Sequence, residues 1–150
     1  MFRRDPEQGA FAEYSCFDPA SIVPVPETVS DEQAVSLGVP FWTAVQALFH
    51  RIGLPLPPSD GSQGNATGTL FIHGASSAIG VFAIQLAKLT GVKVIATASA
   101  HNLPYLRELG ADVAIDRSGD YLEQVEAEGP VDYLIDLFTE QGAHSEPRRR

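Results

Sequence analysis

Residues 68–91 read Gly-Thr-Leu-Phe-Ile-His-Gly-Ala-Ser-Ser-Ala-Ile-Gly-Val-Phe-Ala-Ile-Gln-Leu-Ala-Lys-Leu-Thr-Gly. A short apolar run, Thr69 to His73, is followed by a cluster of small residues and then by a helical pattern of apolar residues from Ala78 to Thr90. This order predicts a strand, a tight turn and a helix. Small side chains at the turn let phosphate groups approach the backbone, and a helix N-terminus presents unpaired N–H groups. The stretch therefore predicts a site for a dinucleotide pyrophosphate.

The turn departs from the strict dinucleotide fingerprint G-x-G-x-x-G, because its three glycine positions hold Ala75, Ser77 and Gly80. Alanine and serine are the smallest substitutes for glycine, and the strand and helix that the motif needs are predicted on either side. A tight turn with no ligand is the alternative. The candidate pyrophosphate residues are Ala75, Ser76, Ser77, Ala78, Ile79 and Gly80.

The composition of the chain limits the classes of protein to which it can belong. With 150 residues, 44% hydrophobic and 19% charged, it is long enough for one globular domain, or for one domain and part of another. A net charge of -9 argues against binding to nucleic acid or to anionic membranes. No apolar run reaches the roughly 20 residues that span a bilayer, and residues 1–7 have no apolar core for a secretion signal. We therefore expect a soluble cytoplasmic protein.

Metal and disulfide chemistry are not expected. The single cysteine, Cys16, excludes an internal disulfide and a four-cysteine zinc site. His50, His73 and His144 have no ligand spacing to each other or to Cys16. Cys16 follows an alternating pattern that predicts a short strand through Tyr14, so we expect it to be a half-buried strand thiol.

Two helices in tandem are predicted over residues 30–53. Ser30 and Gln33 form a capping box, and Pro40 interrupts the apolar pattern and is expected in the first turn of the second helix. Thr43 lies in that helix, where an ordinary first-turn hydroxyl is the simplest interpretation. Residues 54–68 are rich in proline and glycine and predict a surface loop.

After this loop, a strand and helix unit repeats. Strands are predicted to begin near Thr69, Val92, Asp112 and Val131, and the helices between them (78–90, 102–109 and 120–128) each end at a glycine. This alternation predicts the α/β class, with parallel βαβ units and helices on both faces of a doubly wound sheet. The runs 94–96 and 133–135 are apolar throughout and favour strands buried on both faces. The fourth strand is left as a sheet edge, and a polar tail follows over residues 139–150.

The end of the second predicted strand bears on the cofactor. An acidic residue there would bind the adenosine ribose and repel a 2′-phosphate, but residues 96–102 contain none. Ser99, His101 and Asn102 offer donors instead, which favours NADPH over NADH. Helix capping by Ser99 and Asn102 is the alternative. Arg107, one to two turns further on, is a weaker candidate, since a solvated helix face explains it equally well. For the polar residues that follow the third and fourth strands (Asp116, Arg117 and 136–140), solvation is preferred to a functional role.

Five motifs follow one another along the chain: Gly9–Tyr14, Gly38–Ala44, His73–Gly80, Ile95–Asn102 and Leu109–Asp112. In this order they resemble the medium-chain dehydrogenase/reductase superfamily, and within it the zinc-free quinone reductases and the fungal trans-acting enoyl reductases that serve polyketide synthases. The resemblance implies a remnant of a GroES-like substrate domain (1–29), linking helices (30–53), a loop (54–68) and a partial Rossmann domain for NADPH (69–138). It also implies hydride transfer from the nicotinamide to an activated C=C bond or a quinone, with a small-molecule or acyl-thioester substrate and a polyketide synthase as partner.

The resemblance also assigns roles to individual residues. Thr43 matches the helix threonine near the nicotinamide amide, residues 75–80 match the pyrophosphate turn, and Ser99, His101 and Asn102 match the place of the 2′-phosphate. No catalytic residue is carried over. Because the front of the substrate domain and the last Rossmann strands are not in the sequence, we expect an incomplete fragment that self-associates through its sheet edge. The alternative is a non-catalytic module that binds a nucleotide or a partner.

Overall fold

The computed structural model describes residues 13–138, which divide into two units, one ending at Val35 and one beginning at Ser36. The predicted strand at residues 9–14 lies largely outside the described residues, and its last two residues form a bend. The expectation for Cys16 was wrong: this cysteine is exposed, because the first unit offers it no sheet to pack against among the described residues.

The first unit contains a 3-10 turn, η2 (Pro19–Ser21), and the start of helix α1 (Asp31–Ser36). The capping box predicted before α1 is confirmed. The Gln33 amide donates to Ser30 Oγ at 3.3 Å, and the Ser30 amide donates to Gln33 Oε1 at 3.0 Å. These two bonds satisfy backbone donors that the first turn of a helix leaves unpaired.

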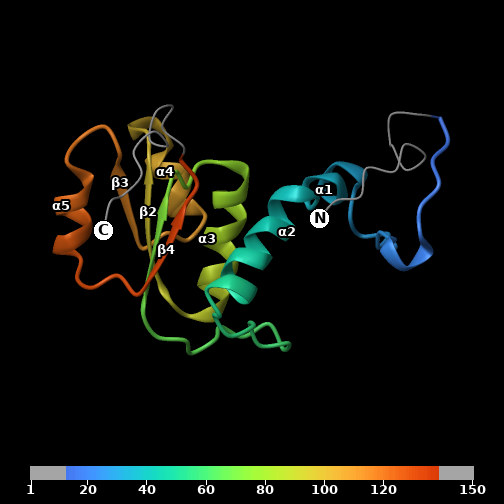
Figure 1. The fold of residues 1–150 in the computed structure, drawn as a ribbon, viewed down its shortest axis with the longest axis horizontal. Coiled ribbons are helices and arrows are strands. Elements are labelled where there is room, and N and C mark those ends of the chain that lie inside the picture. The colour runs from blue at the N-terminus through green and yellow to red at the C-terminus, as the bar shows by residue number, and fades with distance from the viewer. Residues whose placement is uncertain (1–12, 139–150) are drawn as a thin grey trace, which may run out of the picture. The chain divides into compact units, whose positions relative to one another are not determined.

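The second unit is built on a four-stranded parallel sheet in the order β3-β2-β1-β4 (Figure 1). The strands are β1 (Thr69–His73), β2 (Lys93–Ala98), β3 (Val113–Asp116) and β4 (Tyr133–Asp136). The order places β1 and β2 at the centre, with Phe71 opposite both Ile95 and Leu134. The α/β class and the parallel βαβ units predicted from the sequence are thus confirmed.

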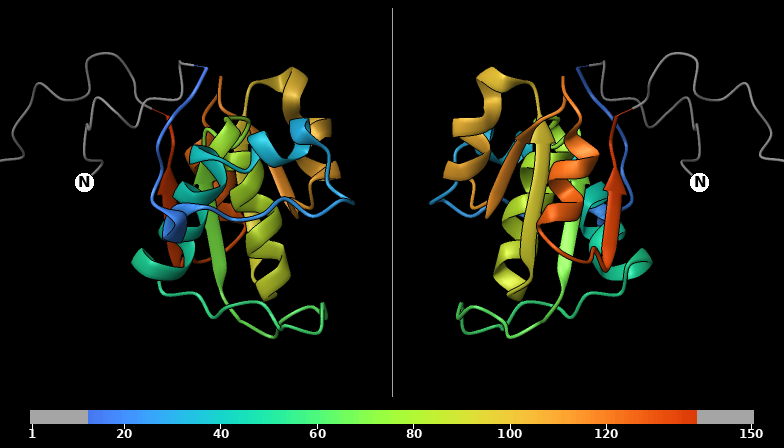
Figure 2. Two further views of the ribbon diagram at one scale, coloured as in Figure 1. Left: turned by 90° about the vertical axis from the view of Figure 1, so that its right-hand side faces the viewer. Right: turned by 90° about the vertical axis from the view of Figure 1, so that its left-hand side faces the viewer.

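Helices cover both faces of the sheet (Figures 1 and 2). Helices α3 (Ala78–Thr90) and α4 (Leu103–Glu108) pack on one face, and α5 (Tyr121–Ala127) packs on the other. Because side chains alternate along a strand, Leu70 and Ile72 face α3 while Phe71 faces α5. The three predicted glycines end their helices with positive φ angles of 102°, 104° and 105°, at Gly91, Gly110 and Gly129.

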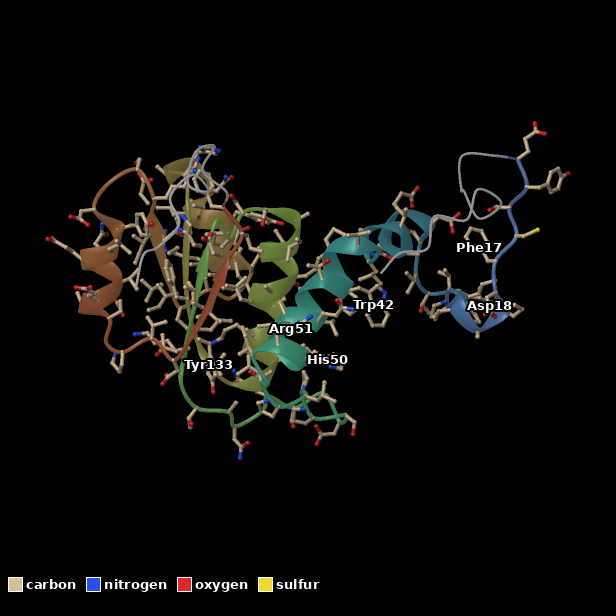
Figure 3. The ribbon with its side chains drawn as sticks, in the orientation of Figure 1. Phe17, Asp18, Trp42, His50, Arg51 and Tyr133 are labelled. Carbon is tan, nitrogen blue, oxygen red and sulfur yellow. The ribbon has the colours of Figure 1, made fainter. Side chains whose placement is uncertain are left out.

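The tandem helices are also confirmed. Helix α1 ends at Ser36, α2 (Val39–Val45) carries Pro40 in its first turn, and a turn of π-helix, η3 (Gln46–Arg51), follows. Figure 3 shows Trp42 on α2 and His50 and Arg51 on η3. Helix α2 packs on α3, with the Phe41 and Phe82 rings edge to face at 5.7 Å.

The loop at residues 54–68 is more than a surface connection. The Gly64 and Ala66 amides donate to the carbonyls of Leu89 and Thr90, and the Gln63 side chain donates to that of Lys88. These are among the last carbonyls of α3, which lack partners within the helix. The loop therefore caps the C-terminus of α3, and Leu54 at its start is buried in the core.

Strand β4 differs from its prediction. It lies at the edge of the sheet, as expected, but only Ile135 is buried, while Leu134 is 58% exposed. Leu134 is on the α5 face, and α5 packs over Ile95, Ile115 and Phe71 rather than over β4. Burial on both faces is therefore confirmed for residues 94–96 of β2 and was wrong for residues 133–135.

Candidate functional site

The turn after β1 is held by the end of the neighbouring strand. Gly74 has a φ of 74°, a conformation that favours glycine, and its amide donates to Thr97 Oγ1 at 3.3 Å. The Ala75 amide donates to the Thr97 carbonyl at 2.8 Å. The Ala75 side chain is fully buried in the core, so it leaves the open side of the turn clear.

The start of α3 explains which of the three fingerprint positions must be glycine. Ser77 is the N-cap, and its Oγ accepts a hydrogen bond from the Gly80 amide at 3.2 Å. A Cβ on Gly80 would overlap the backbone of Ala75, including its carbonyl oxygen. Glycine is therefore required at position 80, whereas alanine fits at 75 by pointing inward and serine fits at 77 by capping the helix.

Three amides at this turn have no acceptor among the described residues. Hydrogen bonds account for the amides of Gly74, Ala75, Ser77 and Gly80, but none is recorded for those of Ser76, Ala78 and Ile79. Ser76 is exposed, and the three amides lie at the positive end of a 13-residue helix. This donor set matches the chemistry of a pyrophosphate, so the residues present fit a dinucleotide.

Two adjoining depressions lie at the carboxyl edge of the sheet. The first has a volume of about 260 Å³ and is lined by Gly74, Ser76, Ser77, Ala98, Ser99, Arg117, Leu137 and Phe138. The second has a volume of about 240 Å³ and is lined by His73, Ser99, Ala100, Asp116, Arg117, Ser118, Tyr121 and Phe138. They share Ser99, Arg117 and Phe138, and the first opens beside the turn. All four strands thus contribute residues to one edge, where doubly wound sheets bind ligands.

Arg117 stands between the two depressions. Its Nε donates to Ser99 Oγ at 3.2 Å, and its guanidinium carbon lies 4.3 Å from the centre of the Phe138 ring. The ion pairs recorded within residues 13–138 join Lys88 to Asp112 and Lys93 to Glu128, so the charge of Arg117 is not neutralised by an ion pair in that part of the chain. Arg117 is therefore held by two contacts within the protein, and a functional role for it stays a prediction.

Ser99 does not cap the helix that follows it. Its hydroxyl accepts from Arg117, and neither Ser99 nor Asn102 makes a side-chain capping bond. The capping alternative for these two residues is therefore not what the structure contains. His101 and Asn102 lie in the 3-10 turn η4 (Ala100–Asn102) and are not among the residues that line either depression.

One carboxylate lines the second depression. Asp116 Oδ1 accepts a hydrogen bond from the Ser118 amide at 3.0 Å, and the bonds from Ser118 hold the pKa of Asp116 below its usual value of 3.8, with a smaller contribution from the charge of Arg117. Asp116 is therefore ionised at neutral pH. It is not among the residues of the first depression, where Arg117 contributes the permanent positive charge.

An aromatic wall closes the second depression. The ring of His73 stacks on Tyr121 at 4.9 Å and meets Phe138 edge to face at 5.5 Å, while its Nδ1 lies 2.7 Å from Thr97 Oγ1. No role at this edge was predicted for the His73 side chain from the sequence. Its position as the last residue of a central strand, directly before the turn, was the signal for a role at this edge.

Two other expectations concern Thr43 and metal binding. Thr43 Oγ1 donates to the Val39 carbonyl at 2.7 Å within α2, and Thr43 is not among the residues that line the two depressions. Among residues 13–138, no three side chains of histidine, cysteine, aspartate or glutamate are grouped so that they could hold a metal ion. In the same range, no helix has the length and apolar character needed to cross a bilayer.

The sheet order and the turn define a doubly wound α/β domain of the dinucleotide-binding type. The model of the zinc-binding dehydrogenase family matches residues 78–144. A trans-enoyl reductase of Alternaria alternata is 41% identical over 110 residues, which are 73% of this chain and 31% of that protein. The chain belongs to the medium-chain dehydrogenase/reductase superfamily.

Solved structures agree with this assignment. A quinone oxidoreductase from Coxiella burnetii matches with a TM-score of 0.68 and 37% identity, over 85% of this chain and 37% of that one. The quinone oxidoreductase from Thermus thermophilus, which was also solved in complex with NADPH, matches with a TM-score of 0.61 and 28% identity, over 77% and 35%. The chain spans about a third of the length of the curated relatives it matches.

Proposed function

We propose that this chain binds NADPH as the Rossmann part of an oxidoreductase of the enoyl reductase or quinone reductase type. The observation that carries the proposal is the set of amides at Ser76, Ala78 and Ile79 that have no recorded acceptor within residues 13–138. Ser76 lines a depression that also contains the Arg117 guanidinium, for which no ion pair is recorded within the same residues. Both features favour an anionic ligand, and the turn and the depression are adjacent.

In this proposal the pyrophosphate lies at residues 75–80. Its oxygens accept from the three free amides, and the dipole of α3 adds a favourable interaction with negative charge. The side chain of Ala75 is buried in the core, and the hydroxyl of Ser77 is engaged in capping the helix. These two residues therefore act as substitutes for glycine rather than as obstacles.

The adenosine end is assigned to the region of Ser99 and Arg117. A 2′-phosphate there would accept from the guanidinium and from the Ser99 hydroxyl, and Phe138 offers an apolar surface beside them. His101 and Asn102 remain part of the proposal as residues of the adjacent turn. The Thermus thermophilus relative was solved with NADPH, which supports the same cofactor for this chain.

The reaction is proposed for the whole protein of which this domain would be a part. Bound NADPH would supply a hydride to an activated C=C bond or to a quinone. Thr43 is proposed to lie near the nicotinamide amide, residues 1–29 to belong to a GroES-like substrate domain, and residues 30–53 to link the two. The likeness to a trans-enoyl reductase supports an acyl-thioester substrate, with a polyketide synthase as the proposed partner.

Titration of the full 150-residue chain with NADPH and with NADH, followed by nucleotide fluorescence, tests the proposal. We expect saturable binding of both nucleotides, with NADPH tighter. A Ser76→Glu variant places a like charge beside the pyrophosphate and should weaken both nucleotides by about tenfold or more. Gln85→Glu adds the same charge farther along α3 and should change little. A wild-type chain that binds neither nucleotide contradicts the proposal and favours a partner-binding module.

A further inference from the structure

One buried hydroxyl touches both halves of the candidate site. Thr97 is fully buried near the end of β2, and its Oγ1 meets the Gly74 amide at 3.3 Å and His73 Nδ1 at 2.7 Å. Its carbonyl accepts from the Ala75 amide at 2.8 Å. Thr97 therefore contacts the phosphate turn through Gly74 and Ala75, and the aromatic wall through His73.

The hydrogen-bonding capacity of the hydroxyl allows it to bond to the Gly74 amide and to the His73 ring at the same time. The Gly74 amide can only donate, so Oγ1 accepts from it. When the imidazole carries its proton on Nε2, the hydroxyl donates to His73 Nδ1; when the proton is on Nδ1, the hydroxyl accepts from it through its second lone pair. The bond between Thr97 and His73 therefore forms with either tautomer. The Thr97 hydroxyl thus holds the His73 ring, which also contacts Tyr121 and Phe138.

Resting on the proposed function, we propose that Thr97 is a positioning residue for nucleotide binding. Its hydroxyl fixes the position of the Gly74–Ala75 turn relative to the His73 ring. The amides of the turn and the aromatic wall can then contact the same nucleotide. Thr97 lines neither depression and does not touch the ligand itself. It acts through Gly74 and His73.

Three variants of the full chain test this role. Thr97→Val removes the hydroxyl and keeps the shape of the side chain, Thr97→Ser restores the hydroxyl, and Thr90→Val is the matched control. Thr90 is also buried, and its Oγ1 donates to the Ala87 carbonyl at 2.7 Å at the far end of α3. Each variant is compared with the wild type in NADPH affinity, in the ¹⁵N chemical shifts of the His73 ring and in exchange of the Gly74 amide.

We expect Thr97→Val to weaken NADPH binding by about fivefold to tenfold, the effect of one hydrogen bond. The ¹⁵N shifts of the His73 ring should change, because Nδ1 loses its hydrogen-bond partner, and the Gly74 amide should exchange faster. Thr97→Ser should restore all three measurements. Thr90→Val should lower the thermal midpoint and leave all three unchanged, because its hydroxyl is remote from the site.

Wild-type affinity together with wild-type His73 shifts in Thr97→Val overturns the role of Thr97, as does an equal loss of affinity in Thr90→Val. A wild-type chain that binds no nucleotide overturns the proposed function and with it the part of this role that concerns binding. In that case the ¹⁵N shifts of His73 and the exchange of the Gly74 amide still test the hydrogen bonds of the Thr97 hydroxyl. Changed signals in Thr97→Val support these bonds, and unchanged signals contradict them.

Discussion

At the scale of single residues, the conformation of the turn at residues 74–80 depends on the size and direction of each side chain. Ala75 points into the core, Ser77 caps α3, and Gly80 has no room for a Cβ beside the Ala75 carbonyl. The backbone of the turn leaves little space at each of the three fingerprint positions, and each residue fits for a different reason.

Gly80→Ala should therefore destabilise the chain. The added methyl group overlaps backbone, which cannot move aside as the end of a flexible side chain can, and overpacking of this kind costs about 1–3 kcal/mol. Urea unfolding followed by circular dichroism measures the loss. Gly119→Ala is the control, because a Cβ at Gly119 meets nothing within 4 Å. Equal stability of the two variants would contradict the steric account.

Arg117 is the residue expected to separate NADPH from NADH. Arg117→Gln removes the charge and the fork of donors, so the Kd for NADPH should rise by about tenfold or more while that for NADH changes little. Isothermal titration calorimetry measures both. Arg107→Gln removes the same charge from exposed α4, where the guanidinium donates to the Ala114 carbonyl at 3.3 Å, and should preserve the NADPH affinity. An equal loss for both nucleotides in Arg117→Gln, or the same loss in Arg107→Gln, would refute this assignment.

At the scale of elements, helix α3 is fixed at both ends by segments outside it. Ser77 satisfies an amide at its N-terminus, while Gln63, Gly64 and Ala66 satisfy carbonyls at its C-terminus. The loop approaches closely because neither Gly64 nor Gly91 has a side chain: a Cβ on Gly64 would overlap the Thr90 backbone, and one on Gly91 would overlap the Gly64 carbonyl.

Gly64→Ala should release this loop from α3. The clash with the Thr90 backbone should break the Gly64 and Ala66 hydrogen bonds and lower the free energy of unfolding by about 1–3 kcal/mol. Hydrogen exchange at the Ala66 amide, which should become faster, reports the release directly. Asn65→Ala changes the exposed neighbouring residue and should leave the exchange of Ala66 unaltered. Slow exchange of Ala66 in Gly64→Ala would show that the loop does not need the close approach.

At the scale of the whole molecule, the sheet leaves β4 at an edge, and Leu134 on that strand is largely exposed. An edge strand favours pairing with another chain, because its outward N–H and C=O groups can bond to a further strand. An exposed apolar side chain on that strand adds to this tendency. The self-association expected from the sequence stays a prediction, and strand β4 is where we expect it to occur.

Leu134→Lys should reduce self-association, since a lysine on an edge strand opposes strand pairing. Light scattering after size-exclusion chromatography, over a range of protein concentrations, measures the average mass. Leu122→Lys is the control, because Leu122 is 55% exposed but lies on helix α5. A wild-type chain that is monomeric at every concentration, or an equal effect of both lysines, would contradict a role for β4.

The sequence by itself determined the elements and their class. Gly91, Gly110 and Gly129 end their helices with positive φ, as their spacing predicted, and the alternation of strands with helices required a parallel sheet. These features could be predicted because each depends on residues close together in the chain. The capping box of Ser30 and Gln33 was predictable for the same reason.

Only the tertiary structure decided which side chains meet at the carboxyl edge. Ser99, Arg117 and Phe138 follow three different strands, and the order β3-β2-β1-β4 brings their side chains together. The same order left Leu134 exposed, although the apolar sequence of its strand, β4, resembles that of the buried strand β2. Local sequence patterns indicate the periodicity of a strand but not which strands lie beside it. The burial of a strand, and the contacts between strand ends that are far apart in the sequence, therefore depend on the order of the whole sheet.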